Sequence, residues 1–174
     1  MILRRRQKRP KAFEQGPRRY AEQLPAASVV AASLLAILPV MAESGWWPDF
    51  GLLALIAWRL QRSDPFPNWA AIPLGLFNDL VTLNPVGLSI VTFTVALLVL
   101  DVMDARKMRG NFVTDWLVAL ALIAFAEFLQ LWIAAIQGAA MPLEILWAPI
   151  VISGLFFPVV AAIVAMLDRY RLRK

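Results

Sequence analysis

The chain of 174 residues contains neither cysteine nor histidine. The absence of cysteine excludes disulfide bonds and thiol nucleophiles, and the absence of both residue types excludes Cys/His zinc sites and imidazole general bases. Charged residues are also few, at 17% of the chain, and no phosphate-binding loop, nucleophile elbow, HExxH motif or Ser–Lys spacing is present. The sequence therefore predicts a protein that is not an enzyme, with no catalytic residues, no metal site and no cofactor.

Apolar residues make up most of what is present. They account for 60% of the chain, against roughly 45–50% in a soluble domain, and the mean hydropathy is +0.67. This composition predicts an integral membrane protein with little mass outside the membrane. The pI of about 10.2 would otherwise suggest nucleic-acid binding. Because the basic residues flank the apolar segments, membrane topology explains them and no nucleic-acid partner is predicted.

The apolar residues fall into six segments, and a helix needs about 20 residues to cross the hydrocarbon core. The sequence therefore predicts an all-α bundle of six transmembrane helices over residues 26–168. A basic N-terminal tail, residues 1–25, precedes the bundle, and a basic C-terminal tail, residues 169–174, follows it. The six segments are approximately residues 26–42, 48–60, 68–84, 86–104, 112–136 and 145–167.

The second and third segments are the shortest, and Pro65, Pro67 and Pro73 interrupt them. They form either two spans or one re-entrant pair. The charge pattern favours six crossings, because all 17 Lys and Arg lie in the two tails, in every second connection or, for Arg59, next to such a connection. Under the positive-inside rule, this alternation predicts that both termini are cytoplasmic.

The N-terminal tail begins with a cluster of basic residues, Arg4, Arg5, Arg6, Lys8 and Arg9. Each such charge near an anionic membrane surface contributes about 1 kcal/mol of attraction. We therefore expect this cluster to lie at the membrane surface, where its simplest role is to determine topology.

Asp79 is the leading candidate for a functional residue, because an ionised side chain in a membrane span costs roughly 2.5–3.5 kcal/mol even on the most lenient scale. Gly75 lies four residues earlier, on the same helix face, where a small residue allows another helix to approach closely. The structural interpretation, which we favour, is that Asp79 bonds to a neighbouring helix or to free amides near the turn at residues 84–85. The functional interpretation is a ligand for a proton or a substrate.

Glu127 is the second candidate, and Gln130 lies three residues later on the same helix face. Both are predicted to be buried polar groups. Since the third and fifth segments run in the same direction, Asp79 and Glu127 are expected at neighbouring depths. They would form either a proton relay or a neutral, hydrogen-bonded structural pair.

Three further expectations concern charged and small residues. Asp101 and Asp104 end the fourth segment, and we expect them to form salt bridges with the basic loop at residues 106–109. Arg59 is expected to snorkel to the inner membrane interface. In the sixth segment, Gly154 lies between two prolines, which predicts a small, bent face for helix packing.

The segment GLFNDLVTLNPVGLS, residues 75–89, resembles the signature of the rod shape-determining MreD family. That signature has a glycine and an aspartate four residues apart, apolar residues, and a second glycine eight residues after the aspartate, in a small six-span protein. Gly75, Asp79 and Gly87 match these positions. The length of the chain and the number of apolar segments are also similar.

The resemblance implies a non-enzymatic, multi-pass protein of the bacterial inner membrane. It would bind an MreC-like scaffold and help couple MreB filaments to the cell-wall transpeptidase and polymerase that synthesise peptidoglycan. The family's fold is also similar to the substrate-binding membrane subunits of energy-coupling-factor transporters. A partner helix would pack at Gly75, Asp79, Gly87 and Gly154. The alternative is a small-molecule or proton-coupled transporter subunit that binds its substrate through Asp79 and Glu127.

Overall fold

The computed structural model describes residues 23–38, 47–62, 66–106, 111–139 and 142–172. Within these ranges all regular structure is helical, so the all-α prediction is confirmed. The basic cluster Arg4, Arg5, Arg6, Lys8 and Arg9 lies outside the described residues. Three short 3₁₀ helices, η1 to η3, accompany the α-helices. The elements are α1 (Leu24–Ser33), η1 (Leu34–Ile37), α3 (Phe50–Gln61), η2 (Asn68–Ala70), α4 (Ala71–Thr82), α5 (Leu88–Ala105), α6 (Phe112–Ile136), η3 (Leu143–Leu146) and α7 (Trp147–Leu172).

Three of these helices, α5, α6 and α7, are long and apolar enough to cross a membrane, which indicates a membrane protein. Helices α1, α3 and α4 are shorter, with 10, 12 and 12 residues. A 12-residue helix is about 18 Å long, whereas the hydrocarbon core is about 30 Å thick. Each predicted segment thus contains a helix, but helix length alone does not make α1, α3 and α4 full spans.

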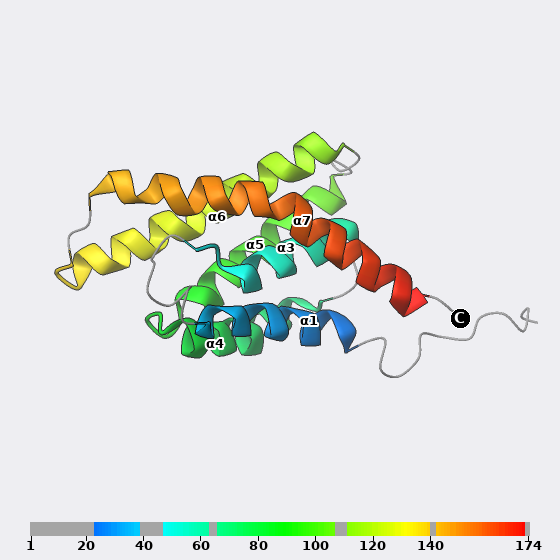
Figure 1. The fold of residues 1–174 in the computed structure, drawn as a ribbon, viewed down its shortest axis with the longest axis horizontal. Helices are drawn as coiled ribbons and strands as arrows, with labels where there is room; N and C mark the ends of the chain where they lie inside the picture. Colours follow the sequence, from blue (N-terminus) through cyan, green and yellow to red (C-terminus); the bar gives the residue numbers. More distant parts are fainter. Residues whose placement is uncertain (1–22, 39–46, 63–65, 107–110, 140–141, 173–174) are drawn as a thin grey trace, which may run out of the picture.

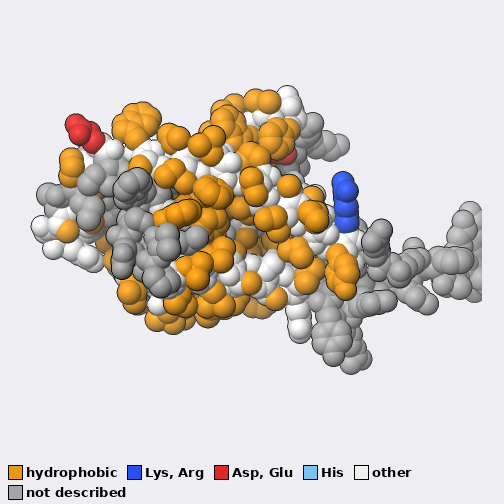
Figure 2. All heavy atoms as spheres, in the orientation of Figure 1, with side chains coloured by type: hydrophobic (Ala, Val, Ile, Leu, Met, Phe, Trp, Pro, Cys, Tyr) orange, Lys and Arg blue, Asp and Glu red, His pale blue; other side chains and the backbone are white. Residues whose placement is uncertain are grey.

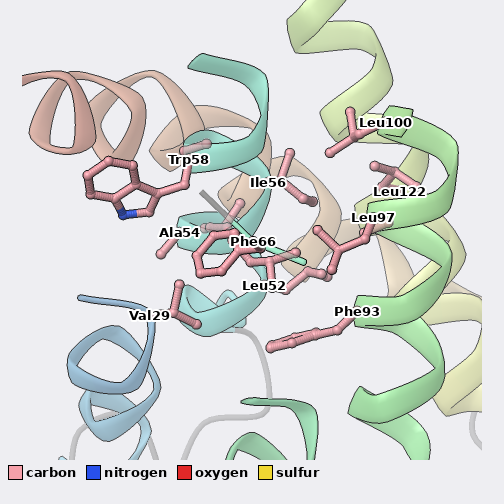
Figure 3. Close-up of a cluster of buried hydrophobic side chains, with 14 of the residues drawn as sticks. Val29, Leu52, Ala54, Ile56, Trp58, Phe66, Phe93, Leu97, Leu100 and Leu122 are labelled. Carbon is pink, nitrogen blue, oxygen red and sulfur yellow. The ribbon is translucent and has the colours of Figure 1, made fainter. Parts of the chain in front are cut away.

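Helix α3 lies at the centre of the bundle (Figure 1). Every residue from Gly51 to Arg59 is buried, as expected for a helix that is apolar on all sides. Helices α1, α5, α6 and α7 pack around it. Figure 3 shows side chains of α1 and α5, including Val29 and Leu97, directed toward α3. The buried indole N–H of Trp58 in α3 donates a hydrogen bond to Ser28 Oγ of α1 at 2.6 Å.

The outer surface of the bundle is largely apolar. Helices α6 and α7 expose large side chains such as Phe128, Trp132, Leu155 and Ile163. The face drawn in Figure 2 is covered mainly by hydrophobic side chains, with the few charged ones toward the two ends. Exposed apolar area of this extent is the pattern of a surface that contacts lipid or other membrane helices.

Candidate functional site

Asp79, in α4, caps the N-terminus of α5. Its Oδ2 accepts a hydrogen bond from the backbone N–H of Gly87 at 2.7 Å, and its Oδ1 accepts one from the N–H of Ser89 at 2.8 Å. The first N–H groups of a helix have no partner within the helix, and a carboxylate there also interacts favourably with the helix dipole. Asp79 is only 1% exposed. Both of its oxygens are therefore engaged inside the α4–α5 hairpin, as the structural interpretation describes.

Gly75 makes this capping possible, because it lets the first turn of α5 lie against α4. A Cβ on Gly75 would come within 2.6 Å of the backbone N and Cα of Ile90. Ser89 carries one of the two capped amides and Ile90 follows it directly, so any side chain at position 75 would push this part of α5 away from Asp79. Gly75 thus packs against a helix of its own chain.

Gly87 has a conformational role within the chain, whereas the packing of a partner helix predicted at this position stays a prediction. A Cβ at this position would meet no atom within 4 Å. Its φ of +106° is instead a left-handed conformation that L side chains rarely adopt. As the N-cap of α5, Gly87 turns the chain so that its own N–H faces Asp79. The three residues of the motif therefore build one local structure. Gly75 lets α4 and α5 approach closely, Gly87 turns the chain, and Asp79 caps the start of α5.

Asn78 extends this arrangement to α3. It is 0% exposed, and its Nδ2 donates hydrogen bonds to Asp49 Oδ2 at 2.7 Å and to Ser89 Oγ at 2.9 Å. Asp49 is itself the N-cap of α3, where its Oδ1 accepts from the N–H of Leu52 at 3.0 Å. The sequence analysis missed both residues. The signal for Asp49 was present, because an aspartate directly before an apolar run is a typical N-cap.

A cavity of about 680 Å³ opens beside this network, at the end of the bundle that holds the α4–α5 turn. Its polar lining comes from five helices, from the α4–α5 turn and from the residues just before α3. The polar lining residues include Ser33, Asp49, Ser89, Thr92, Glu127 and Ser153.

Glu127 of α6 lines this cavity together with Asp49, and the two carboxyl groups interact electrostatically. Asp79 does not line it among the described residues, so the predicted pairing of Asp79 with Glu127 is corrected. Gln130 lines the cavity but is exposed, and Glu127 is only partly buried, so the prediction that both are buried is also corrected. The amide of Gln130 lies 3.5 Å from Asn84 Oδ1 in the α4–α5 turn.

No match was found when this chain was compared with protein-family models, with curated proteins and with solved structures. The family resemblance stated above therefore rests on Gly75, Asp79 and Gly87, and on the hairpin that these three residues build.

A network of ion pairs lies at the opposite end of the bundle. Arg59, at the end of α3, is 3% exposed and pairs with both Asp101 and Asp104 of α5, the latter at 2.6 Å. Arg62 pairs with Asp168 of α7 at 2.8 Å. The predicted snorkelling of Arg59 is corrected, because its charge is neutralised inside the bundle. Arg59 is a partner of both aspartates that the sequence analysis did not predict. Their predicted pairing with the basic loop falls mainly on residues 107–110, which lie outside the described residues, and stays a prediction.

Gly154 joins the two longest helices. A Cβ on Gly154 would lie 2.7 Å from a methyl carbon of Leu120 in α6, and its carbonyl oxygen accepts a hydrogen bond from Trp116 Nε1 at 3.1 Å. The small face predicted around this residue is therefore filled by α6 of the same chain.

Proposed function

We propose that this chain is a non-enzymatic, multi-pass subunit of the bacterial cell-elongation machinery, in the inner membrane. It would bind an MreC-like scaffold and help couple MreB filaments to the transpeptidase and polymerase that build peptidoglycan. The observation that carries the proposal is the α4–α5 hairpin formed by Gly75, Asp79 and Gly87.

The hairpin supports the family resemblance because its three residues depend on one another. Replacing Gly75 separates the two helices, replacing Gly87 strains the turn, and replacing Asp79 leaves two amides without an acceptor. Three separate matches to a glycine and aspartate pattern arise easily by chance. A match to all three residues that together form one capped hairpin is more specific than a match to each residue alone.

The same geometry changes where a partner would bind. The spaces beside Gly75 and Gly154 are occupied by α5 and by Leu120, so neither glycine offers an open groove. The apolar outer faces of α6 and α7 remain available, and membrane helices associate through packing of this kind. We propose that the hairpin supports the partner-binding surface indirectly, by fixing how α5 lies in the bundle.

We also propose six membrane crossings with both termini in the cytoplasm. The ion pairs support this arrangement, because the end of α3 lies beside the ends of α5 and α7. A re-entrant α3 that turned back within the membrane would end short of these two helices. The described parts of the connections at the other end of the bundle, 83–87, 137–139 and 142–146, contain no Lys or Arg, in keeping with the positive-inside rule.

The functional test is purification of the tagged full-length protein in mild detergent, with identification of the proteins that co-purify. We expect an MreC-like scaffold and a cell-wall transpeptidase. Asp79→Ala and Gly75→Leu should each reduce the recovered scaffold by about tenfold, the effect of losing about 1.4 kcal/mol of binding. Leu80→Ala, at an exposed neighbouring position of α4, is the matched control and should change nothing. Unchanged recovery with both folded hairpin variants contradicts the proposal.

A second candidate is a transporter subunit that binds a small molecule or protons, and the cavity favours it. A fold similar to the substrate-binding subunits of energy-coupling-factor transporters would suit that role. Two carboxylates were proposed to bind the substrate. Glu127 lines the cavity, but both oxygens of Asp79 accept hydrogen bonds from amides at the start of α5. Co-purification of a pair of ATPases in place of the scaffold would make this candidate the primary one.

A further inference from the structure

We propose that the cavity lined by residues of α1, α3, α4, α5, α6 and α7 binds a small organic cation, an ammonium compound with an apolar body. This inference does not depend on the elongation function, because it concerns a ligand held within the chain itself. It rests on the charge of the cavity, on an unpaired buried hydroxyl at its wall and on its apolar surfaces.

The charge of the described lining residues is negative. Asp49 and Glu127 contribute two carboxyl groups, and none of the described lining residues is Lys or Arg. Two carboxylates that share a poorly solvated space repel each other. Arg59 and Arg62 are the described arginines nearest to Asp49 in the sequence. Both are paired with aspartates at the other end of the bundle. A bound cation would offset the repulsion between Asp49 and Glu127.

Unpaired polar atoms give the second, independent observation. Ser33, which is 2% exposed, lines the cavity, and its Oγ has no hydrogen-bond partner in the described part of the chain. The Oδ1 atom of the fully buried Asn78 is unpaired in the same sense. Buried polar atoms nearly always have a partner, so the unpaired Ser33 Oγ at the wall of the cavity indicates a ligand.

These two unpaired atoms lie close together. A Cβ on Gly51 would be 2.3 Å from Ser33 Oγ and 2.5 Å from Asn78 Oδ1, so the glycine leaves both atoms facing one small space. Of the groups that line the cavity itself, the Ser33 hydroxyl and the carboxylates of Asp49 and Glu127 can accept hydrogen bonds, so the cavity suits a ligand that donates them. An ammonium group supplies both the donors and the positive charge.

The remaining walls suit an apolar body. Trp47 and Phe50 line the cavity, and aromatic faces attract organic cations. The volume of about 680 Å³ lies within the range of roughly 300–1,000 Å³ typical of small-molecule sites. No group of three or more acidic side chains that could hold a metal ion occurs among the described residues. The geometry therefore favours an organic cation over a metal ion.

The test compares 3,3-dimethylbutan-1-amine, whose ammonium group carries N–H donors, with 3,3-dimethylbutan-1-ol, a molecule of nearly the same shape that lacks the charge. Thermal unfolding and tryptophan fluorescence of the purified full-length protein are measured in detergent as each compound is titrated. The amine should raise the unfolding temperature as its concentration increases, because a ligand of the native state stabilises it. The neutral compound should not. Ethanolamine and spermidine are tested alongside, since the identity of the natural amine is open.

Variants test whether the amines bind in this cavity. Glu127→Gln keeps the size of the side chain but removes its charge, and should weaken binding of the best amine by about tenfold or more. Ser33→Ala removes a hydroxyl that has no partner in the described chain, so the fold is kept while binding weakens severalfold. Glu144→Gln is the same chemical change at an exposed position outside the cavity and should have no effect.

Three results would overturn the proposal: no shift with any of the three amines, an equal shift with the neutral compound, or undiminished binding by both Glu127→Gln and Ser33→Ala. None of them bears on the elongation function, because no partner protein is present in the experiment.

Discussion

At the scale of single residues, Asp79 shows how an apolar hairpin accommodates a carboxylate. Its oxygens satisfy two amides that would otherwise be left without partners at the start of α5. The cost of burying the side chain is offset by hydrogen bonds that the helix needs in any case. Asp79 is therefore explained by local backbone chemistry, and a role for it as a substrate ligand is not required.

Asp79→Ala should lower the free energy of unfolding by about 3 kcal/mol, because hydrogen bonds to charged groups contribute about 1.5–3 kcal/mol each. Asp79→Asn keeps one acceptor oxygen and should fall between the alanine variant and the native protein. Denaturation of the detergent-solubilised protein with SDS, followed by tryptophan fluorescence, measures the difference. If Asp79→Ala unfolds at the same point as Leu80→Ala, the capping bonds contribute little.

At the scale of elements, α3 is shorter than the hydrocarbon core is thick, but it is the helix around which α1, α5, α6 and α7 pack. Each of its ends is tied to other helices by polar groups. Asp49 connects its start to α4 through Asn78, and Arg59 connects its end to α5. These ties set the depth of α3 in the bundle, since its uniform apolar surface would fit at several depths.

Arg59→Met should destabilise the protein by about 3–5 kcal/mol, because it leaves two aspartates beside a buried position without their cation. Adding Asp101→Asn and Asp104→Asn to the same chain should recover part of the loss. Arg62→Met is the control, since this more exposed arginine should contribute about 1 kcal/mol or less. SDS denaturation of the four proteins measures these differences. Equal effects of Arg59→Met and Arg62→Met would contradict a special role for the buried arginine.

At the scale of the whole molecule, the two ends of the bundle differ in kind. One end holds the capped hairpin and the acidic cavity, and the other holds the arginine–aspartate pairs. In the proposed topology the cavity lies at the outer side of the membrane and the ion pairs lie at the cytoplasmic side. Ligand and partner would then meet different faces of the same protein.

This topology is directly testable because the chain contains no cysteine. Single substitutions Ala139→Cys, Ala105→Cys and Asn68→Cys, all at exposed positions, are treated with a membrane-impermeant maleimide in intact spheroplasts. Ala139→Cys should be labelled at once, and the other two only after the membrane is permeabilised. Labelling of Asn68→Cys from outside would instead favour the re-entrant arrangement of α3 and α4.

The sequence by itself determined the features that depend on neighbouring residues. Hydropathy placed a helix in each of the six predicted segments, because the membrane selects apolar, helix-length runs wherever they occur. The motif of Gly75, Asp79 and Gly87 could also be recognised in the sequence, because all of its residues lie within 15 positions and one turn brings them together.

Only the tertiary structure decided which distant side chains meet. Arg59 pairs with Asp101 and Asp104 at separations of 42 and 45 residues, and Glu127 lines the same cavity as Asp49, whereas Asp79 does not. Such pairings depend on how each helix is rotated and how deeply it is set against its neighbours. In helices with apolar residues on nearly every face, the sequence pattern leaves that rotation undetermined, and side-chain packing chooses it.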